Sequence, residues 1–206
     1  RPSDWHPDWV PPAMHATRRR PERDTYGDLV ALVAEEKLGR PLLPWQRYVA
    51  DVAMEYRLRT VELPDDDGVV RPIDVPVLCY RYPTGTVPRQ SGKTTLGLPV
   101  KVHRALGWPS LAPAPYGGPQ NIVYTAQDRN HAFKKWDKEP VPRIESAKRL
   151  RGLYKVRRTN GSEGIRWGTG SFYGIEAVGL TSGHGETLDL AFNDESFKHI
   201  DFRVDQ

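Results

Sequence analysis

Nine residues near the middle of the chain have the composition of a turn that binds phosphate. They read Val87-Pro88-Arg89-Gln90-Ser91-Gly92-Lys93-Thr94-Thr95. Gly92 lets the backbone approach an anion without a Cβ in the way, and amides at the start of a following helix bind that anion. Lys93 is placed to reach the β- and γ-phosphates of a nucleotide, and the Thr94 hydroxyl is placed to ligate Mg²⁺. The general pattern requires a Gly where Val87 stands, so the turn by itself leaves an ordinary helix-capping turn equally open.

An acidic pair near the end of the chain could supply the other half of a hydrolytic site. The segment Leu188-Asp189-Leu190-Ala191-Phe192-Asn193 is mostly apolar and leads directly into Asp194-Glu195. Asp194 would hold the water shell of Mg²⁺, and Glu195 would orient and polarise the attacking water. Because both halves are present, each in the context that it needs, the sequence predicts an Mg²⁺-dependent ATPase.

These two segments need a sheet and helices to position them. Apolar runs and turn residues predict strands over residues 76–87, 121–126, 153–158, 164–168, 171–178 and 187–193. Helices are expected over residues 25–39, ended by Gly39, over 44–56, opened by Pro44, and over 93–106. Apolar residues along 45–56 are spaced to form a stripe on one face of the second helix: Trp45, Tyr48, Val49, Val52 and Tyr56. Two further helical pieces, split by Pro140 and Pro142, are expected in the block after Asp128, which can cap the first of them. A turn at residues 64–68 predicts an added β-hairpin. Strands that alternate with helices predict an α/β fold with a mainly parallel sheet and helices on both faces.

Composition restricts the class of protein. The chain has 206 residues and one cysteine, Cys79, which excludes an intramolecular disulfide framework, and its six histidines have no zinc-ligand spacing. No apolar run approaches the ~18–20 residues that a membrane span requires. The net charge of +4 is uneven, since residues 129–158 carry eleven basic and three acidic side chains. Such a block fits contact with a polyanion, and it equally fits a solvated helix face.

The phosphate-binding turn resembles the Walker A motif of the large terminase subunits of tailed bacteriophages. In that family an Arg stands early in the loop, as Arg89 does, and the first Gly is often missing, as it is at Val87. Leu43-Pro44-Trp45-Gln46 is similar to the family's Trp-Gln motif on the adenine side. Residues 121–128, 168–171, 183–185 and 194–195 follow in the family's order, so the resemblance covers residues 25–196.

The resemblance implies a P-loop ATPase domain of the ASCE type over residues 25–206, after an N-terminal arm over residues 1–24. The chain is then expected to be an excerpt, without the C-terminal part of that domain and without the nuclease domain, so DNA cleavage is expected only of a full-length protein. Large terminases hydrolyse ATP to drive double-stranded DNA into a procapsid. The implied partners are DNA, a portal protein, a small terminase subunit and further copies in a ring, in the host cytoplasm at the portal vertex and without a membrane.

The resemblance also assigns roles to single residues. Gln46 would hydrogen-bond the adenine edge, while Trp45 would pack near the base or in the core. Arg89 would sense or stabilise the γ-phosphate, because a guanidinium offers two parallel contacts to phosphate oxygens. The expected catalytic residues are Glu195, Lys93 and Arg89. Thr94 and Asp194 would hold Mg²⁺, and the nucleotide would also contact Pro88, Gln90, Ser91, Gly92 and Thr95.

The basic block would supply DNA or subunit contacts. The candidates are Lys134, Lys135, Lys138, Arg143, Arg149 and Arg151. The resemblance further implies an arginine finger that each subunit gives to its neighbour. Arg129, Arg143, Arg149 and Arg151 are all candidates for that finger.

Two other functions remain open. Another nucleic-acid-dependent P-loop motor, such as a helicase-type ATPase, would share the roles of Lys93, Thr94, Asp194 and Glu195, although the Arg89-containing turn without its first Gly argues against it. A nucleotide-binding adaptor that does not hydrolyse ATP would have no need of Glu195.

Overall fold

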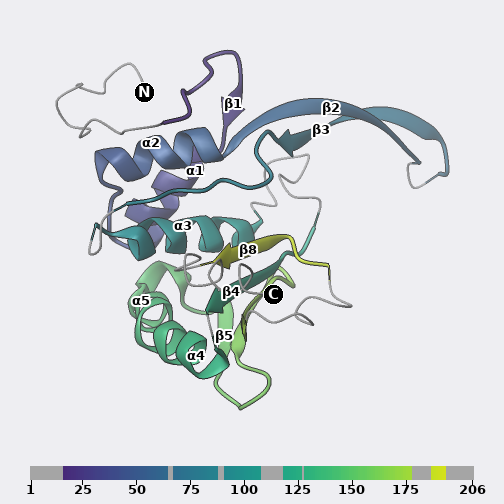
Figure 1. The fold of residues 1–206 in the computed structure, drawn as a ribbon. Coiled ribbons are helices and arrows are strands. Elements are labelled where there is room, and N and C mark those ends of the chain that lie inside the picture. Colours follow the sequence, from purple (N-terminus) through teal and green to yellow (C-terminus); the bar gives the residue numbers. More distant parts are fainter. Residues whose placement is uncertain are drawn as a thin grey trace, which may run out of the picture. The chain divides into compact units, whose positions relative to one another are not determined.

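The computed structural model describes residues 16–64, 67–87, 91–107, 118–126, 128–177 and 187–193. Their contacts divide them into two compact units, of which unit 1 ends at Val100 and unit 2 begins at Lys101. Unit 1 contains a three-stranded antiparallel sheet and unit 2 a five-stranded mixed sheet (Figure 1). No helix in these residues is long and apolar enough to cross a membrane. The chain therefore has a mixed α/β fold.

The helices of unit 1 begin and end close to the expected residues. Helix α1 (Gly27–Leu32) continues into a π-helical turn, Val33–Lys37, and α2 covers Pro44–Ala53. The helix stop that Gly39 predicts is confirmed, since this glycine has a φ of 66° just after the π-helical turn. Pro44 opens α2 as expected, because a proline is tolerated in the first helical turn, where no N–H is needed.

The apolar stripe predicted along residues 45–56 is confirmed only in part: Val52 is buried, but the stripe does not include Val49 and does not reach Tyr56. Helix α2 ends at Ala53, and Tyr56 already belongs to a strand. Val49 is 37% exposed, whereas Ala50 is buried with Tyr26, Val30 and Met54 in the core of unit 1. The buried side of α2 is less apolar than predicted, because it also contains the small residue Ala50 and the polar residues Gln46 and Asp51.

The predicted hairpin is confirmed as a long antiparallel ribbon. Strand β2 (Glu55–Pro64) pairs with β3 (Val70–Leu78), and the short β1 (Asp24–Thr25) pairs with the start of β2. The strand expected over residues 76–87 is wrong, because β3 ends at Leu78 and residues 79–87 form no strand. Residues 76–78 pair with β2 in this ribbon and do not enter a parallel sheet.

The sheet of unit 2 has the strand order β5-β6-β7-β4-β8. Its strands are β4 (Asn121–Ala126), β5 (Tyr154–Arg157), β6 (Gly164–Trp167), β7 (Phe172–Ala177) and β8 (Leu190–Asn193). Strand β4 pairs in parallel with both β7 and β8, whereas β5-β6-β7 are antiparallel. The expected strands are confirmed, but the sheet is mixed, because turns shorter than a crossover helix join β5 to β6 and β6 to β7.

Three helical elements cover one face of this sheet. Helix α4 (Arg129–Lys138) begins after Asp128, whose Oδ1 accepts a hydrogen bond from the His131 N–H at 2.7 Å, so the predicted cap is confirmed. Helix α5 (Pro140–Ser146) lies beside α4 in Figure 1, and its Ile144 carbonyl accepts a hydrogen bond from the Tyr154 hydroxyl. The second half of α3 (Lys93–Leu106) packs on the same face, over Tyr124 and Phe192.

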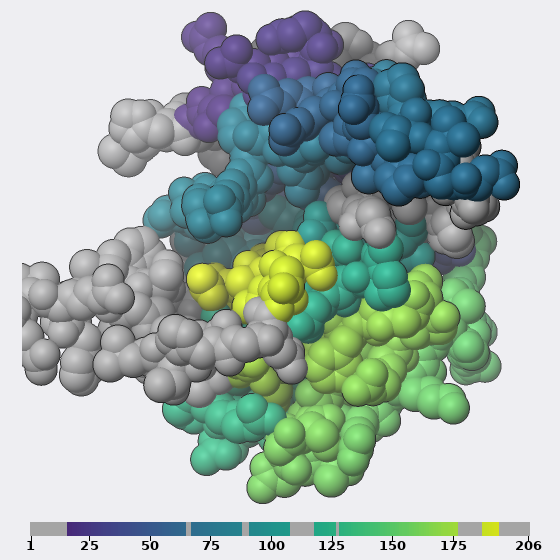
Figure 2. Space-filling view, turned by 90° about the vertical axis from the view of Figure 1, so that its right-hand side faces the viewer, coloured from purple at the N-terminus to yellow at the C-terminus, as the bar shows by residue number. Residues whose placement is uncertain are grey.

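Helices were expected on both faces of the sheet, and the structure differs at the second face. The register places Lys155, Arg166, Phe172 and Asn121 in one row on that face. Among the described residues, no helix of unit 2 lies over it (Figure 1). Figure 2 looks onto a side of unit 2 where β8 (yellow) lies beside β4 (teal).

Candidate functional site

The predicted phosphate-binding turn ends where α3 begins. Gly92 has a φ of 92°, a conformation that favours glycine, and α3 starts at the next residue. Its carbonyl accepts hydrogen bonds from the Thr95 N–H at 3.0 Å and from Gln46 Nε2 at 2.9 Å. A Cβ at this position would lie 2.8 Å from Gln46 Nε2. Backbone conformation and space therefore both require glycine here.

Gln46 anchors this turn to helix α2. Its side chain is completely buried; Oε1 accepts a hydrogen bond from the Leu43 N–H at 2.8 Å, while Nε2 donates to the Gly92 carbonyl. A buried amide that satisfies two backbone groups positions both of them, since leaving either group unpaired would be costly. The structure thus gives Gln46 a positioning role in the turn, and its contact with adenine stays a prediction. Trp45, next to it, is half-buried.

Lys93 and Thr94 occupy the first turn of α3. Lys93 is exposed, while Ser91, Thr94 and Thr95 are half-buried. The first turn of this 14-residue helix contains no acidic side chain that would compete with an anion. An ammonium, a hydroxyl and the positive end of a helix dipole fit a nucleotide phosphate and its Mg²⁺. Pro88, Arg89 and Gln90 lie outside the described residues.

The second predicted half of the site follows strand β8. Because β8 runs parallel to β4 and β7, the carboxyl ends of all three strands lie at one edge of the sheet. At this edge the Thr125 hydroxyl donates a hydrogen bond to Oδ1 of Asn193, which is the last residue of β8. Asp194 and Glu195 come directly after Asn193 in the sequence and lie outside the described residues.

A buried lysine that the sequence reading missed packs against β8. Lys101 is only 3% exposed, and its Nζ lies 4.0 Å from the ring centroid of Phe192 and 5.4 Å from those of Tyr124 and Tyr173. Attraction between a cation and aromatic faces stabilises this arrangement. Lys101 therefore ties α3 to the strand that leads into Asp194-Glu195. In the sequence, Lys101 stands between Val100 and Val102 in the predicted helix. A lysine with apolar neighbours on both sides was the signal that could have indicated its burial.

Some cations of the basic block, residues 129–158, form ion pairs with carboxylates of the same chain. Arg129 Nη2 lies 2.5 Å from Glu163 Oε2, and Arg158 bonds both Asp137 and Glu145. Burial alone would raise the pKa of Glu163, but hydrogen bonds from its own amide and from Arg129 lower it. Among the predicted contact residues, Lys135 and Arg143 are half-buried, and the exposed ones are Lys134, Lys138, Arg149 and Arg151. Arg129 is thus held within its own chain, which weakens it as a finger for a neighbour.

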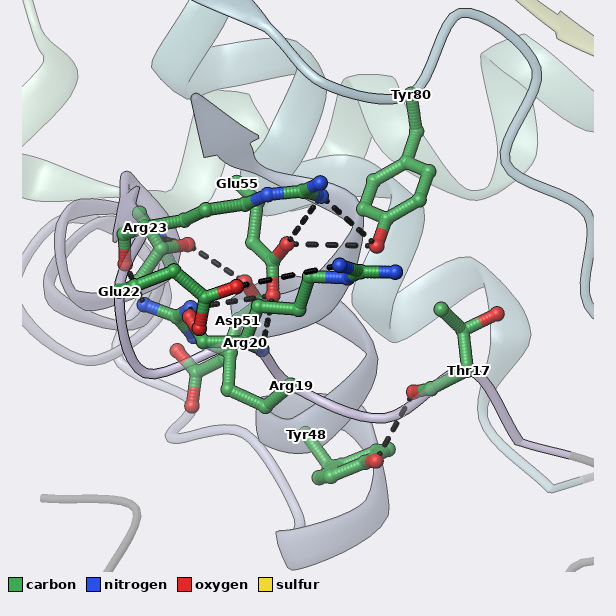
Figure 3. A network of polar contacts seen from close by, with 11 residues as sticks. Thr17, Arg19, Arg20, Glu22, Arg23, Tyr48, Asp51, Glu55 and Tyr80 are labelled. Atoms are coloured by element: carbon green, nitrogen blue, oxygen red, sulfur yellow. Dashed lines mark hydrogen bonds and ion pairs between the residues drawn. The ribbon is translucent and has the colours of Figure 1, made fainter. Parts of the chain in front are cut away.

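A buried carboxylate holds part of the predicted N-terminal arm against unit 1. The Glu55 side chain is completely buried and forms ion pairs with Arg19 and Arg23, each at 3.1 Å (Figure 3). The Tyr80 hydroxyl donates to Glu55 Oε2 at 3.3 Å, and the Arg20 N–H donates to Oε1 at 2.9 Å. Residues 19–23 are therefore ordered on the start of β2. Residues 1–15 of the arm, including Trp5 and Trp9, lie outside the described residues.

The buried His103 of α3 predicts a pH dependence of stability. Burial first, and then the neighbouring Arg104, lowers the pKa of His103 from 6.5 to about 3. Below pH 6.5 the unfolded chain takes up a proton that the folded chain does not, so stability falls as the pH falls toward 3. We expect the free energy of unfolding of the wild type, relative to His103→Gln, to decrease between pH 7 and pH 4.5 by on the order of 1 kcal/mol per pH unit.

Urea unfolding at pH 7, 5.5 and 4.5 measures this difference. If the two chains lose stability in parallel over that range, His103 does not titrate as its burial requires.

Comparison of the chain with protein-family models, with curated proteins and with solved structures found no match.

Proposed function

We propose that this chain hydrolyses Mg-ATP as the P-loop ATPase domain of a terminase-type motor that moves double-stranded DNA into a viral procapsid. The observation that supports it most is the turn at Gly92. A glycine with positive φ, held by the buried Gln46, opens directly onto a helix whose first residues are Lys93 and Thr94. A helix-capping turn needs neither a buried glutamine behind it nor a lysine and a threonine together.

In this proposal the residues divide the chemistry between them. The Lys93 ammonium and the first amides of α3 bind phosphate oxygens and offset the negative charge that develops during phosphoryl transfer. Mg²⁺, when bound, neutralises charge on the phosphates, and Thr94 and Asp194 would hold it. Glu195 orients the attacking water and accepts its proton. Arg89 adds a planar cation for the γ-phosphate.

The proposed assembly follows from the resemblance to large terminases. Copies of the chain would form a ring on a portal protein, with a small terminase subunit as a further partner, in the host cytoplasm. Arg143, Arg149 and Arg151 remain candidates for a finger given to the neighbouring subunit, because Arg129 already pairs with Glu163. If the finger comes from a neighbouring subunit, we expect an isolated chain to hydrolyse ATP more slowly than the assembled ring.

The experiment is phosphate release by the purified chain with Mg-ATP, with and without duplex DNA. We expect release that requires Mg²⁺ and saturates with ATP. Binding of ATP without any release, under single-turnover conditions at high chain concentration, would favour the non-hydrolysing adaptor. Absence of both binding and release would contradict the proposal.

A further inference from the structure

Three cations share the sheet face that faces away from α4 and α5. The register places Lys155 of β5 directly opposite Arg166 of β6, and Arg157 lies two residues farther along β5 on the same face. All three side chains are exposed. Among the described residues, no carboxylate forms an ion pair with any of them. We call these three residues the cationic face.

An aromatic ring fixes the position of one of these cations. The Phe172 ring lies across two glycines, since a Cβ on Gly164 would come within 2.3 Å of it and a Cβ on Gly174 within 2.7 Å. The Arg166 guanidinium carbon stands 5.1 Å from the centroid of this ring. Stacking on an aromatic face restricts the guanidinium, which reduces the entropy lost when it binds a ligand. Arg166 is therefore prearranged to offer its N–H groups.

The charge arrangement is unfavourable for the isolated chain. Like charges directly opposite each other on paired strands destabilise a sheet, and Lys155 and Arg166 are such a pair. Two other cations of the basic block differ, because Arg129 and Arg158 have carboxylate partners in the same chain. An anion that spans several cations would relieve the repulsion on the cationic face. Phosphodiester backbones supply such closely spaced charges.

We propose that the cationic face, rather than the part of the basic block over residues 129–151, binds the phosphate backbone of duplex DNA. The charges and the stacked arginine specify a phosphodiester polyanion, and the choice of duplex DNA rests on the proposed function. Arg166 makes paired hydrogen bonds to one phosphate, and Lys155 and Arg157 bind its neighbours as charges along the strand.

The test compares two triple variants of the full chain that remove the same charge. One is Lys155→Gln, Arg157→Gln and Arg166→Gln. The other, the helical-block variant, is Lys134→Gln, Lys138→Gln and Lys148→Gln, three exposed lysines of α4 and of the 3₁₀ turn at Lys148–Leu150. Fluorescence anisotropy with a labelled 30-base-pair duplex at several salt concentrations gives affinity and its salt dependence. We expect the first variant to lose at least about tenfold in affinity at low salt, with a salt slope smaller by about 2–3. The second should stay within about twofold of the wild type.

A third variant, Arg166→Lys, separates stacking from charge. It keeps the cation but not the planar stacked group, so we expect weaker binding with a nearly unchanged salt slope. Thermal unfolding checks that all variants fold, which their exposed positions favour. The inference is overturned if the helical-block variant loses affinity instead, or if neither triple variant does.

Phosphate release measured on the same proteins distinguishes this inference from the proposed function. DNA binding that depends on the cationic face, in a chain that neither binds nor hydrolyses ATP, would contradict the proposed function alone. Normal hydrolysis with DNA binding insensitive to Lys155, Arg157 and Arg166 would contradict the inference alone.

Discussion

Replacement of Lys93 by alanine is expected to reduce ATP hydrolysis by on the order of 10²–10³-fold, because it removes a charge that stabilises the transition state. The structure supports a direct effect, since Lys93 is exposed at the first position of α3 and its replacement removes little buried surface. Phosphate release under saturating Mg-ATP gives the change in turnover, and binding of a fluorescent ATP analogue gives the change in affinity. We expect both to fall.

The matched control is Lys148→Ala, which removes an exposed lysine from the short 3₁₀ turn in unit 2. It should leave turnover and affinity unchanged. Equal turnover in Lys93→Ala and the wild type would show that the Gly92 turn is a structural cap and not a phosphate site.

Replacement of Glu195 by glutamine is expected to have a different effect, with ATP still bound and hydrolysis reduced by about 10²–10⁴-fold. The amide keeps the size of the carboxylate but cannot accept a proton from the attacking water. Nucleotide should therefore remain trapped on the chain as ATP. Filter binding with labelled ATP, followed by separation of bound ATP from ADP, measures the trapped fraction.

Glu62→Gln is the corresponding control, because Glu62 is an exposed acid of strand β2 with no assigned role in the chemistry. This control should turn over ATP as the wild type does. Loss of ATP binding in Glu195→Gln would mean that Glu195 contributes to binding or folding, and would remove its assignment as the base.

Local signals in the sequence predicted most of unit 2. The short apolar run at Asn121–Ala126 became β4, and Asp128 caps α4 through a hydrogen bond to the third residue after it. Such features depend on residues that are close together in the chain, so they can be predicted without knowledge of the fold. The same holds for Gly92, whose place before Lys93 marked the start of α3.

Pairings between distant residues could not be predicted. The turn at residues 64–68 indicated the hairpin, but nothing indicated that residues 76–78 would belong to it and that no strand would lead into the Gly92 turn. Antiparallel and parallel partners leave similar patterns in a short strand. Glu55 reads as an ordinary polar residue, yet Arg19 and Arg23 make its complete burial possible.

Gln46 illustrates the limit for the candidate site. The resemblance marked it as functional, but its hydrogen bond to a carbonyl 46 positions later could only be seen in the fold. From the likeness to the Trp-Gln motif, we expected the Gln46 side chain to contact the base of the nucleotide. The structure connects the same side chain to the turn that would hold the phosphates.

The most direct test of the proposed ATPase is a single-turnover measurement on three chains in parallel: wild type, Lys93→Ala and Glu195→Gln. Each is incubated with γ-labelled Mg-ATP, and bound ATP and released phosphate are counted per chain. We expect release by the wild type, weaker binding and strongly reduced release by Lys93→Ala, and bound ATP without release by Glu195→Gln. Equal phosphate release by all three chains would contradict the proposal.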